Sequence, residues 1–225
     1  MKTIGMLVAV EMGAVLSRYG TAEKSETRSG FQVYTYDMHG YTLHVISSGA
    51  GEIAAAAATQ MLIDRYGAEL VVNFGVVGGL TAEMAQTRTC VVERVVHYDF
   101  DTSAYDGTLP GQYAEYPDVY LPLNVDLIER AVAIAPELKR VTCASADKFV
   151  DGPAAKSALH ERWDADICEM EAAAVVLTCN RSGVPCLLIK TVSDGLMGGG
   201  EEFGVALQHT SELCLAVADK IIREL

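Results

Sequence analysis

The sequence has few basic residues for its size. It holds 17 lysines and arginines against 30 acidic residues, which gives a net charge of −13 over 225 residues. This negative charge argues against nucleic acids and anionic membranes as partners, because both would repel the protein. A polyanionic substrate would need a local run of lysine and arginine, and no such run occurs. The composition is compatible with a small, uncharged ligand.

The sequence also lacks the run of about 18 apolar residues that a membrane span requires. The N-terminal stretch MKTIGMLVAVEMG joins a lysine to an apolar run, as a signal peptide does. That run covers only residues 4–10, ends at Glu11 and has no clear small-residue cleavage site. It is better interpreted as the first core strand. We therefore expect a cytoplasmic protein without a membrane partner.

The cysteines lack the spacing of a metal site or a disulfide framework. There is no CxxC pair and no cluster of cysteine with histidine. Most of the six lie within apolar runs, which is typical of small buried side chains. We expect no disulfide, no structural zinc and no metal or organic cofactor. Their positions are 90, 143, 168, 179, 186 and 214.

What the sequence contains is an alternation of strand and helix signals, which predicts one α/β domain over residues 1–225. A hairpin is expected around Met38-His39-Gly40. Residues 98–122, rich in Tyr, Asp, Gly and Pro, predict a long irregular segment that is either functional, interfacial or simply solvated. Strands are expected at 3–10, 31–37, 41–48, 69–74, 89–96, 140–146 and 184–192. Helices are expected at 11–18, 52–66, 124–135, 153–161, 170–181 and 204–224.

Carboxylates stand at the borders of two predicted elements. Residues 184–192 (VPCLLIKTV) predict a buried strand that Ser193-Asp194 follows directly, and Glu169-Met170-Glu171 precedes a helix. In open α/β sheets, ligands bind beyond the carboxyl ends of the strands. An acid there can stay partly desolvated, which favours its protonated form and suits it to donating a proton. Alternatively, Asp194 caps the next helix.

Three further segments follow predicted strands. Ser48-Gly49-Ala50-Gly51 and Gly75-Val76-Val77-Gly78-Gly79 are glycine-bearing turns. Each could direct backbone N–H groups at a ligand or serve as an ordinary connection. Phe149, in SADKFVDG (145–152), could stack on a flat base or pack in the core. The coincidence of these features at strand ends favours a shared site.

In combination, five ordered segments resemble the 5′-methylthioadenosine/S-adenosylhomocysteine nucleosidases of the purine nucleoside phosphorylase/uridine phosphorylase superfamily. They are SGAGEIAAA (48–56), NFGVVGGL (73–80), SADKFVDGP (145–153), EMEAAA (169–174) and IKTVSD (189–194). The resemblance covers essentially the whole chain. It implies a three-layer α/β/α phosphorylase/hydrolase-like fold with a mixed, mostly parallel central sheet. It also implies hydrolysis of the N-glycosidic bond of a purine nucleoside, and a homodimer or larger homo-oligomer.

The resemblance implies a role for each matching residue. Asp194 corresponds to the aspartate that protonates the purine N7, Glu171 to the glutamate that holds the ribose hydroxyls, and Phe149 to the ring that stacks on the base. Such an arrangement suits a reaction that builds positive charge on the sugar and negative charge on the base. Further substrate contacts are implied for Val77, Val150, Glu169, Met170, Ser193 and Phe203.

The residues at the positions where the family activates water or holds phosphate differ from the family pattern. The water-activating glutamate of the family corresponds to Gly13, and Glu11 stands two residues earlier, so that its side chain is expected to point elsewhere. A small polar residue of the family is replaced by Val76, and a position that is often arginine by Lys190. Glu52 could supply a substitute base, although a carboxylate at a helix N-terminus is as readily explained by the helix dipole.

Three explanations of this departure are open. The protein could hydrolyse nucleosides with a relocated base, Glu11 or Glu52. It could be a phosphorylase in which Arg18, Arg88 or an arginine of a partner subunit holds phosphate. It could also bind a nucleoside with little turnover.

Overall fold

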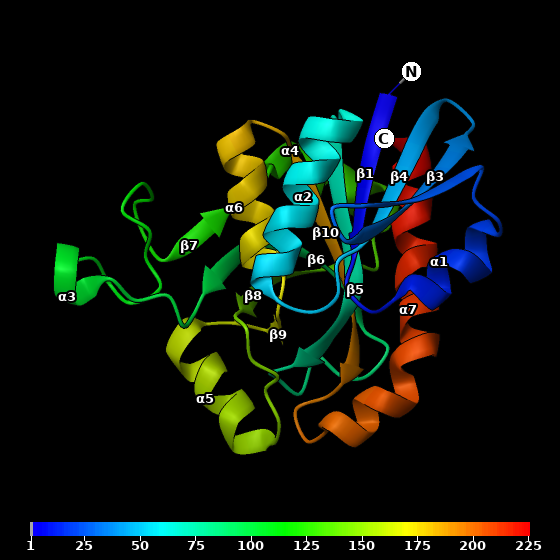
Figure 1. The fold of residues 1–225 in the computed structure, drawn as a ribbon. Helices are drawn as coiled ribbons and strands as arrows, with labels where there is room; N and C mark the ends of the chain where they lie inside the picture. The colour runs from blue at the N-terminus through cyan, green and yellow to red at the C-terminus, as the bar shows by residue number, and fades with distance from the viewer. Residues whose placement is uncertain (1) are drawn as a thin grey trace.

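A mixed β-sheet lies at the centre of the protein, as the computed structural model of residues 2–225 shows (Figure 1). The strands are β1 (Lys2–Val8), β2 (Lys24–Arg28), β3 (Phe31–Met38), β4 (Tyr41–Ser47), β5 (Leu70–Gly79), β6 (Thr89–His97), β7 (Tyr120–Pro122), β8 (Lys139–Ser145), β9 (Ile167–Glu169) and β10 (Cys186–Asp194). The helices are α1 (Met12–Tyr19), α2 (Glu52–Tyr66), α3 (Ser103–Asp106), α4 (Val125–Ile134), α5 (Pro153–Trp163), α6 (Ala172–Ser182) and α7 (Gly200–Glu224).

The central strands β4, β1, β5 and β10 run parallel to one another. β5 and β10 are buried along almost their whole length, as expected of parallel strands covered on both faces. β5 also pairs with β9, and the pairing continues through β8 and β6 back to β10. These five strands therefore close into a ring, while β1, β4, β3 and β2 extend the sheet on one side.

Helices cover both faces of the sheet, which confirms the three-layer α/β/α fold. α2 and α6 pack against each other and against one face, whereas α1 and α4 pack against α7 on the other (Figure 1). α2 can approach the sheet closely because its inward side carries alanines, including the fully buried Ala55 and Ala58.

β5 is longer than the sequence predicts. The glycine-bearing segment Gly75–Gly79 is not a turn after the strand but its second half. It stays extended because Gly75 to Gly78 pair with Lys190 to Asp194 on β10, and Gly78 and Gly79 pair with β9. Asp194 is correspondingly the last residue of β10 rather than a residue beyond it. Three short strands were missed. The five residues of β2 are all polar, and β7 and β9 have only three residues each, so none of them shows a periodic pattern.

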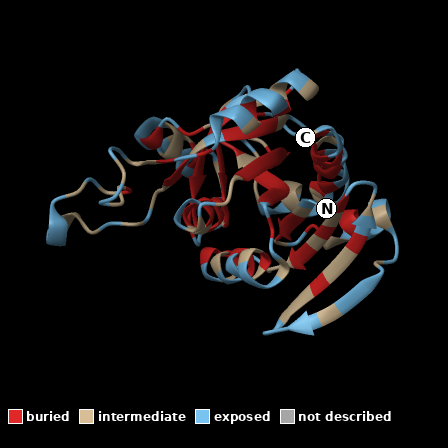
Figure 2. Cartoon of the chain, turned by 90° about the horizontal axis from the view of Figure 1, so that it is seen from above, coloured by how far each residue is buried: buried red, intermediate tan, exposed pale blue. Residues whose placement is uncertain are grey.

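The expected hairpin is present, since β3 and β4 pair antiparallel on either side of the turn at His39 and Gly40. The segment 98–122 is largely irregular, as predicted, with only α3 and β7 as regular structure. In Figure 2 this segment extends away from the body of the molecule, and α3 lies at its exposed tip.

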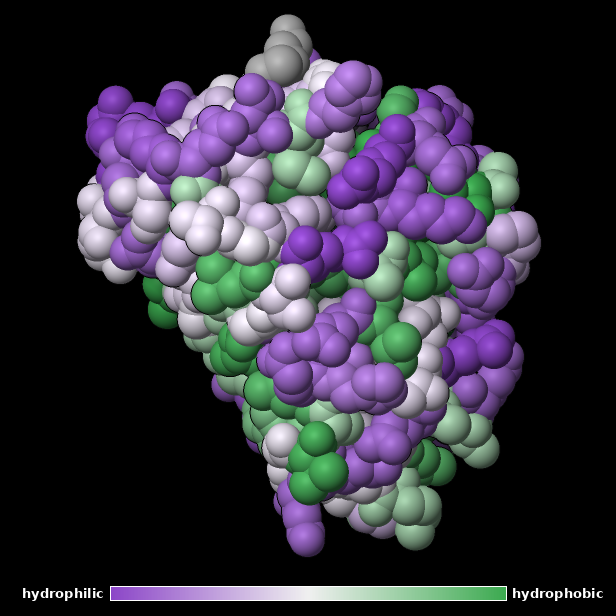
Figure 3. Space-filling model, turned by 90° about the vertical axis from the view of Figure 1, so that its right-hand side faces the viewer, coloured by the Kyte–Doolittle hydropathy of each residue, from purple (hydrophilic) through white to green (hydrophobic). Residues whose placement is uncertain are grey.

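The face that carries α1 and α7 is mainly hydrophilic, with hydrophobic side chains between the polar ones (Figure 3). Within residues 2–225, no helix combines the length and the apolar character needed to cross a bilayer.

Candidate active site

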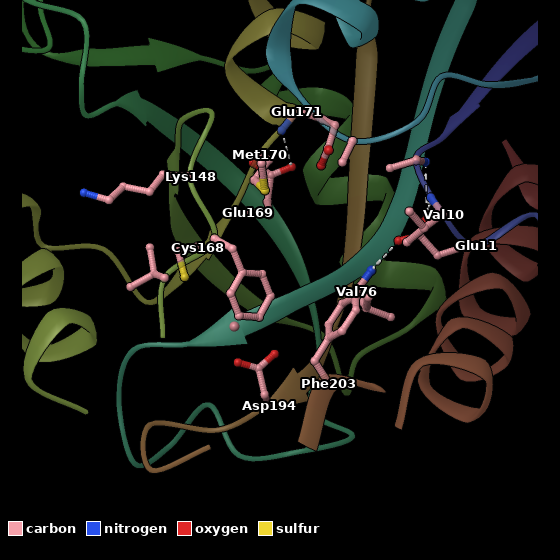
Figure 4. Close-up of a pocket in the computed structure, with 15 residues that line it drawn as sticks. Val10, Glu11, Val76, Lys148, Cys168, Glu169, Met170, Glu171, Asp194 and Phe203 are labelled. Carbon is pink, nitrogen blue, oxygen red and sulfur yellow. Dashed lines mark hydrogen bonds between the residues drawn. The ribbon is translucent and has the colours of Figure 1, made fainter. Parts of the chain in front are cut away.

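A cavity of about 280 Å³ opens at the carboxyl ends of the central strands (Figure 4). It collects side chains from segments that lie far apart in the sequence, because β1, β5, β9 and β10 all end there. Its walls are formed by Ala9, Val10, Glu11, Ala50, Val76, Gly78, Lys148, Phe149, Val150, Cys168, Glu169, Met170, Glu171, Asp194 and Phe203.

Asp194 lies at one end of this cavity and Glu171 at the other in the view of Figure 4. Asp194 is buried, and its Oδ1 accepts a hydrogen bond of 2.8 Å from Ser193 Oγ. Its Oδ2 accepts one of 2.6 Å from Lys156 Nζ, a residue of α5. The alternative that Asp194 merely caps a helix finds no support in these contacts, because α7 begins at Gly200 and its N-cap, Gly199, lacks a side-chain partner.

Glu171 and Glu169 lie two residues apart but have different environments. Glu169 Oε2 receives an ion-pair contact of 3.0 Å from Lys190 Nζ, and both Glu169 oxygens accept the N–H of Ala172 at 3.0 Å. Burial alone would raise the pKa of Glu169, but Lys190 and these donors hold it below the usual range. Burial and the neighbouring Glu169 carboxylate raise the pKa of Glu171 to about 8. Its Oε1 accepts the N–H of Gly51 at 2.9 Å.

Glu11 lines the cavity, so the expectation that its side chain points elsewhere was wrong. It precedes α1, and its carboxylate folds back to accept the N–H groups of Ala9 (3.0 Å) and Val10 (2.9 Å). The other oxygen reaches β5 and accepts the N–H of Val76 at 3.0 Å (Figure 4). The space it occupies is available because residue 75 is glycine: a Cβ there would lie 2.7 Å from Glu11 Oε1.

Glu52 lies outside the cavity. Its carboxylate accepts the hydroxyl of Ser145 at 2.5 Å and the N–H of Ala174 at 2.6 Å, which ties the start of α2 to β8 and α6. Burial, followed by the neighbouring Glu169, raises the pKa of Glu52 to about 8. This arrangement supports the structural interpretation of Glu52 and leaves Glu11 as the carboxylate facing the third side of the cavity.

Two aromatic rings close the outer rim. Phe149 and Phe203 meet edge to face, with their centroids 5.6 Å apart, and Phe149 is 47% exposed. Phe149 is thus not a core residue, because nearly half of its surface is exposed at the rim of the cavity. Val77 and Ser193 lie behind the cavity wall, where Ser193 Oγ donates to the Val77 carbonyl at 3.2 Å.

Comparison with known proteins identifies the family. The model of the phosphorylase superfamily matches residues 3–223. The chain belongs to the phosphorylase superfamily. The matched range contains every residue of the cavity wall, so the site described above lies wholly inside the part shared with this superfamily.

Within the phosphorylase superfamily, the chain is similar to nucleosidases. It is 31% identical over 197 residues to the 5′-methylthioadenosine/S-adenosylhomocysteine nucleosidase of Shewanella putrefaciens, with 85% of each protein covered. The solved structure of the corresponding Helicobacter pylori nucleosidase has a TM-score of 0.93 at 27% identity, covering 100% of this chain and 99% of that one. A futalosine hydrolase mutant of the same bacterium has a TM-score of 0.93 at 25% identity and full coverage of both chains.

Sequence reasoning missed two lysines of this site: Lys148, which lines the cavity, and Lys156, which pairs with Asp194. A signal was available, because Lys156 shares a face of α5 with Leu159 and Trp163, at the spacing of a buried helical stripe. Among residues 2–225, no group of histidine, cysteine and acidic side chains is placed to hold a metal ion.

The raised pKa of Glu52 predicts a pH-dependent stability. An unfolded glutamate titrates near 4.5, so between pH 4.5 and about 8 the folded state retains a proton that the unfolded state releases. The contribution of Glu52 to the free energy of unfolding is therefore largest below pH 4.5, and it decreases as the pH rises from 4.5 to about 8. We expect the free energy of unfolding of Glu52→Gln, measured by urea denaturation, to fall less between pH 5 and pH 8 than that of the wild type, by about 1–3 kcal/mol.

Glu137→Gln serves as the control, because Glu137 is exposed and should keep the wild-type pH dependence. Equal pH dependence of Glu52→Gln and the wild type would show that Glu52 is ionised in the folded protein.

Proposed function

We propose that this protein hydrolyses the N-glycosidic bond of a purine nucleoside similar to 5′-methylthioadenosine or S-adenosylhomocysteine and releases the free base. The whole chain, residues 1–225, would act as one nucleosidase-type domain. The observation that carries the proposal is that Asp194, Glu171 and Glu11 face a single cavity from three sides, with Phe149 at its rim. The named relatives are nucleosidases, which supports the same reaction.

In this proposal the base lies between Phe149 and Asp194. The half-exposed ring of Phe149 stacks on the purine, the backbone of Val150 contacts the base edge, and Asp194 hydrogen-bonds N7. As the C1′–N9 bond breaks, its electron pair moves into the purine, and N7 takes up a proton at Asp194. Supplying this proton makes the base a better leaving group.

Glu171 and Met170 contact the ribose at the other end of the cavity. Glu171 accepts hydrogen bonds from the sugar hydroxyls, and its carboxylate stabilises the positive charge that develops on the ring. Glu169 acts indirectly: its ion pair with Lys190 fixes the backbone that carries Met170 and Glu171. Phe203 covers the cavity from α7.

Glu11 is the proposed base for the attacking water. It replaces the family's glutamate at the Gly13 position from a different point of the chain, since its carboxylate folds back toward Val76. The water loses a proton to Glu11 as its oxygen bonds C1′, which yields the free sugar.

Phosphorolysis has less support. Arg18 is bound to Asp219 through two hydrogen bonds, and of the residues described neither Arg18 nor Arg88 lines the cavity. Lys148 does line it, but in Figure 4 its side chain extends away from the other labelled residues. The cavity wall holds four acidic side chains against one lysine, which disfavours a phosphate anion.

The assay that tests the proposal uses a panel of nucleosides with and without phosphate, including 5′-thio-nucleosides, adenosine, inosine and nucleosides with larger 5′ groups. The sugar product is identified by mass. Free sugar independent of phosphate supports hydrolysis, sugar 1-phosphate supports phosphorolysis, and saturable binding without product supports a binding protein.

All six cysteines are free thiols, which supports the proposed cytoplasmic location.

Asp194→Asn should lower the rate of base release by about 10²–10⁴-fold, because the amide cannot deliver a proton to N7. Binding of the substrate, measured by equilibrium titration of the inactive variant, should change little. Asp64→Asn, an exposed position on α2, is the matched control. Turnover of Asp194→Asn at the wild-type rate would refute the assigned acid.

Glu11→Gln and Glu11→Ala should both retain nucleoside binding and lower kcat by about 10²–10⁴-fold, because the water loses its base. Glu93→Gln, an exposed residue of β6, should keep the wild-type rate. Single-turnover measurements check the chemical step. If either Glu11 variant hydrolyses substrate normally, the base lies elsewhere.

We also propose that the chain forms a homodimer or larger homo-oligomer through the projecting segment 98–122. Tyr105 and Leu109 in this segment are 92% and 61% exposed, which is unusual for large apolar side chains. We expect sedimentation equilibrium to give at least twice the 24.1 kDa chain mass, and the double variant Tyr105→Ser/Leu109→Ser to dissociate more readily. A monomer at assay concentrations would contradict the proposal.

A further inference from the structure

Lys156 is a completely buried lysine, with 0% of its side chain exposed. Its ammonium group donates to Asp194 Oδ2 at 2.6 Å, to the Gly195 carbonyl at 2.7 Å and to the Asp194 carbonyl at 3.3 Å. Three acceptors match the three N–H donors of a charged lysine. Since an unpaired charge would be very costly at this position, the geometry favours an ion pair between Lys156 and Asp194.

The surroundings of the pair are tightly packed. A Cβ placed on Gly78 of β5 would lie 3.0 Å from Cys168 Sγ, 3.4 Å from Asp194 Oδ2 and 3.6 Å from Lys156 Cε. Gly78 therefore leaves the room in which these three side chains meet. No larger residue fits there without displacing one of them.

Few other titratable groups face the pair. Cys168 faces it from β9, and Glu202 of α7 accepts the N–H of Gly195 at 3.1 Å. On α5 itself, His160 is one turn away and bonds the Ala165 carbonyl. Glu169 is the nearest further carboxylate on β9, and its own partner is Lys190. Ser193 Oγ donates a hydrogen bond to the other carboxylate oxygen, Asp194 Oδ1.

An ion-paired aspartate is not by itself a proton donor. The pair as a whole nevertheless holds one transferable proton, because an ammonium beside a carboxylate has the same composition as an amine beside a carboxylic acid. Such coupled groups titrate as a unit rather than separately. The proton that reaches N7 can therefore originate on Lys156.

We propose that Lys156 is a positioning residue for base release: it holds Asp194 as a carboxylate between turnovers and supplies, through Asp194, the proton that N7 takes up. This inference rests on the proposed nucleosidase function. An Nζ–H bond breaks as an Asp194 O–H bond forms, and that O–H bond breaks as N7–H forms. The C1′–N9 electron pair enters the purine. The amine left behind regains a proton from solvent, which balances the proton released by the attacking water.

The alkaline limb of the pH profile distinguishes this role from a structural one. With Lys156 present, activity is lost at high pH only when the pair gives up the proton that it shares. Without Lys156, Asp194 must itself be protonated, so activity disappears at lower pH. The acid limb depends on Glu171, which lies at another wall of the cavity and should be unaffected.

The experiment measures kcat/KM for 5′-methylthioadenosine from pH 5 to pH 10 in the wild type, Lys156→Met and Lys156→Gln. Lys139→Met is the control, because Lys139 lies at the start of β8, pairs with Glu83 and does not line the cavity. Both Lys156 variants should shift the alkaline limb down by at least about one pH unit, with a tenfold loss of activity above it for each unit. Glutamine can still orient Asp194 but carries no transferable proton, so an unshifted limb in Lys156→Gln would overturn the proposal.

The wild type provides a test that does not depend on variant folding. Its kcat/KM should show no alkaline decline below about pH 9, whereas a decline centred below pH 7 would overturn the inference. Thermal unfolding of the double variant Lys156→Met/Asp194→Asn, in which neither residue of the pair carries a charge, shows whether the protein still folds without this ion pair. If the wild type cleaves no nucleoside, the proposed function itself fails. If the wild type is active, Asp194→Asn is inactive and the Lys156 variants keep the wild-type profile, only the role of Lys156 fails.

Discussion

The parallel pairing of β5 with β10 is the constraint on which the rest of the site depends. It continues through the glycines of β5 to Gly78 and Asp194, and so carries both strands to the cavity. At this end β5 presents the Val76 N–H to Glu11 and leaves space at Gly78 for Lys156 and Asp194. The same pairing closes the ring of five strands. A substitution that separated β5 from β10 would disturb Asp194, Glu11 and the fold together.

The site concentrates negative charge and compensates it in two ways. Asp194 and Glu169 each have a buried lysine as partner, Lys156 and Lys190, respectively. Glu171 and Glu52 have no such partner, and burial raises the pKa of each to about 8. Carboxylates of one residue type therefore take different protonation states within a small volume.

Much of this arrangement could be predicted from the sequence, because strand ends collect at one edge of a parallel sheet. Asp194, Glu171 and Phe149 were assigned to one cavity on that basis, and the structure places them there. The position of Glu11 could not be predicted, since it depends on a backbone turn that folds the carboxylate toward Val76.

Other features escaped prediction for related reasons. The second half of β5 looked like a turn because glycine lacks strand propensity, and only its partners on β10 and β9 keep it extended. Lys156 escaped because a lysine on a helix usually faces solvent. In each case the missing information was a tertiary contact between segments distant in the sequence.

The ring of strands also sets the order in which the site can form during synthesis. β5 ends at Gly79, but its pairing partner β10 begins at Cys186, more than a hundred residues later. A chain emerging from the ribosome can build β1, β4 and β5 early, yet it has neither Asp194 nor the closed ring until its last strand appears. Such non-local pairing slows folding and leaves the edge of β5 exposed meanwhile. The cavity is thus one of the last parts of the molecule to form.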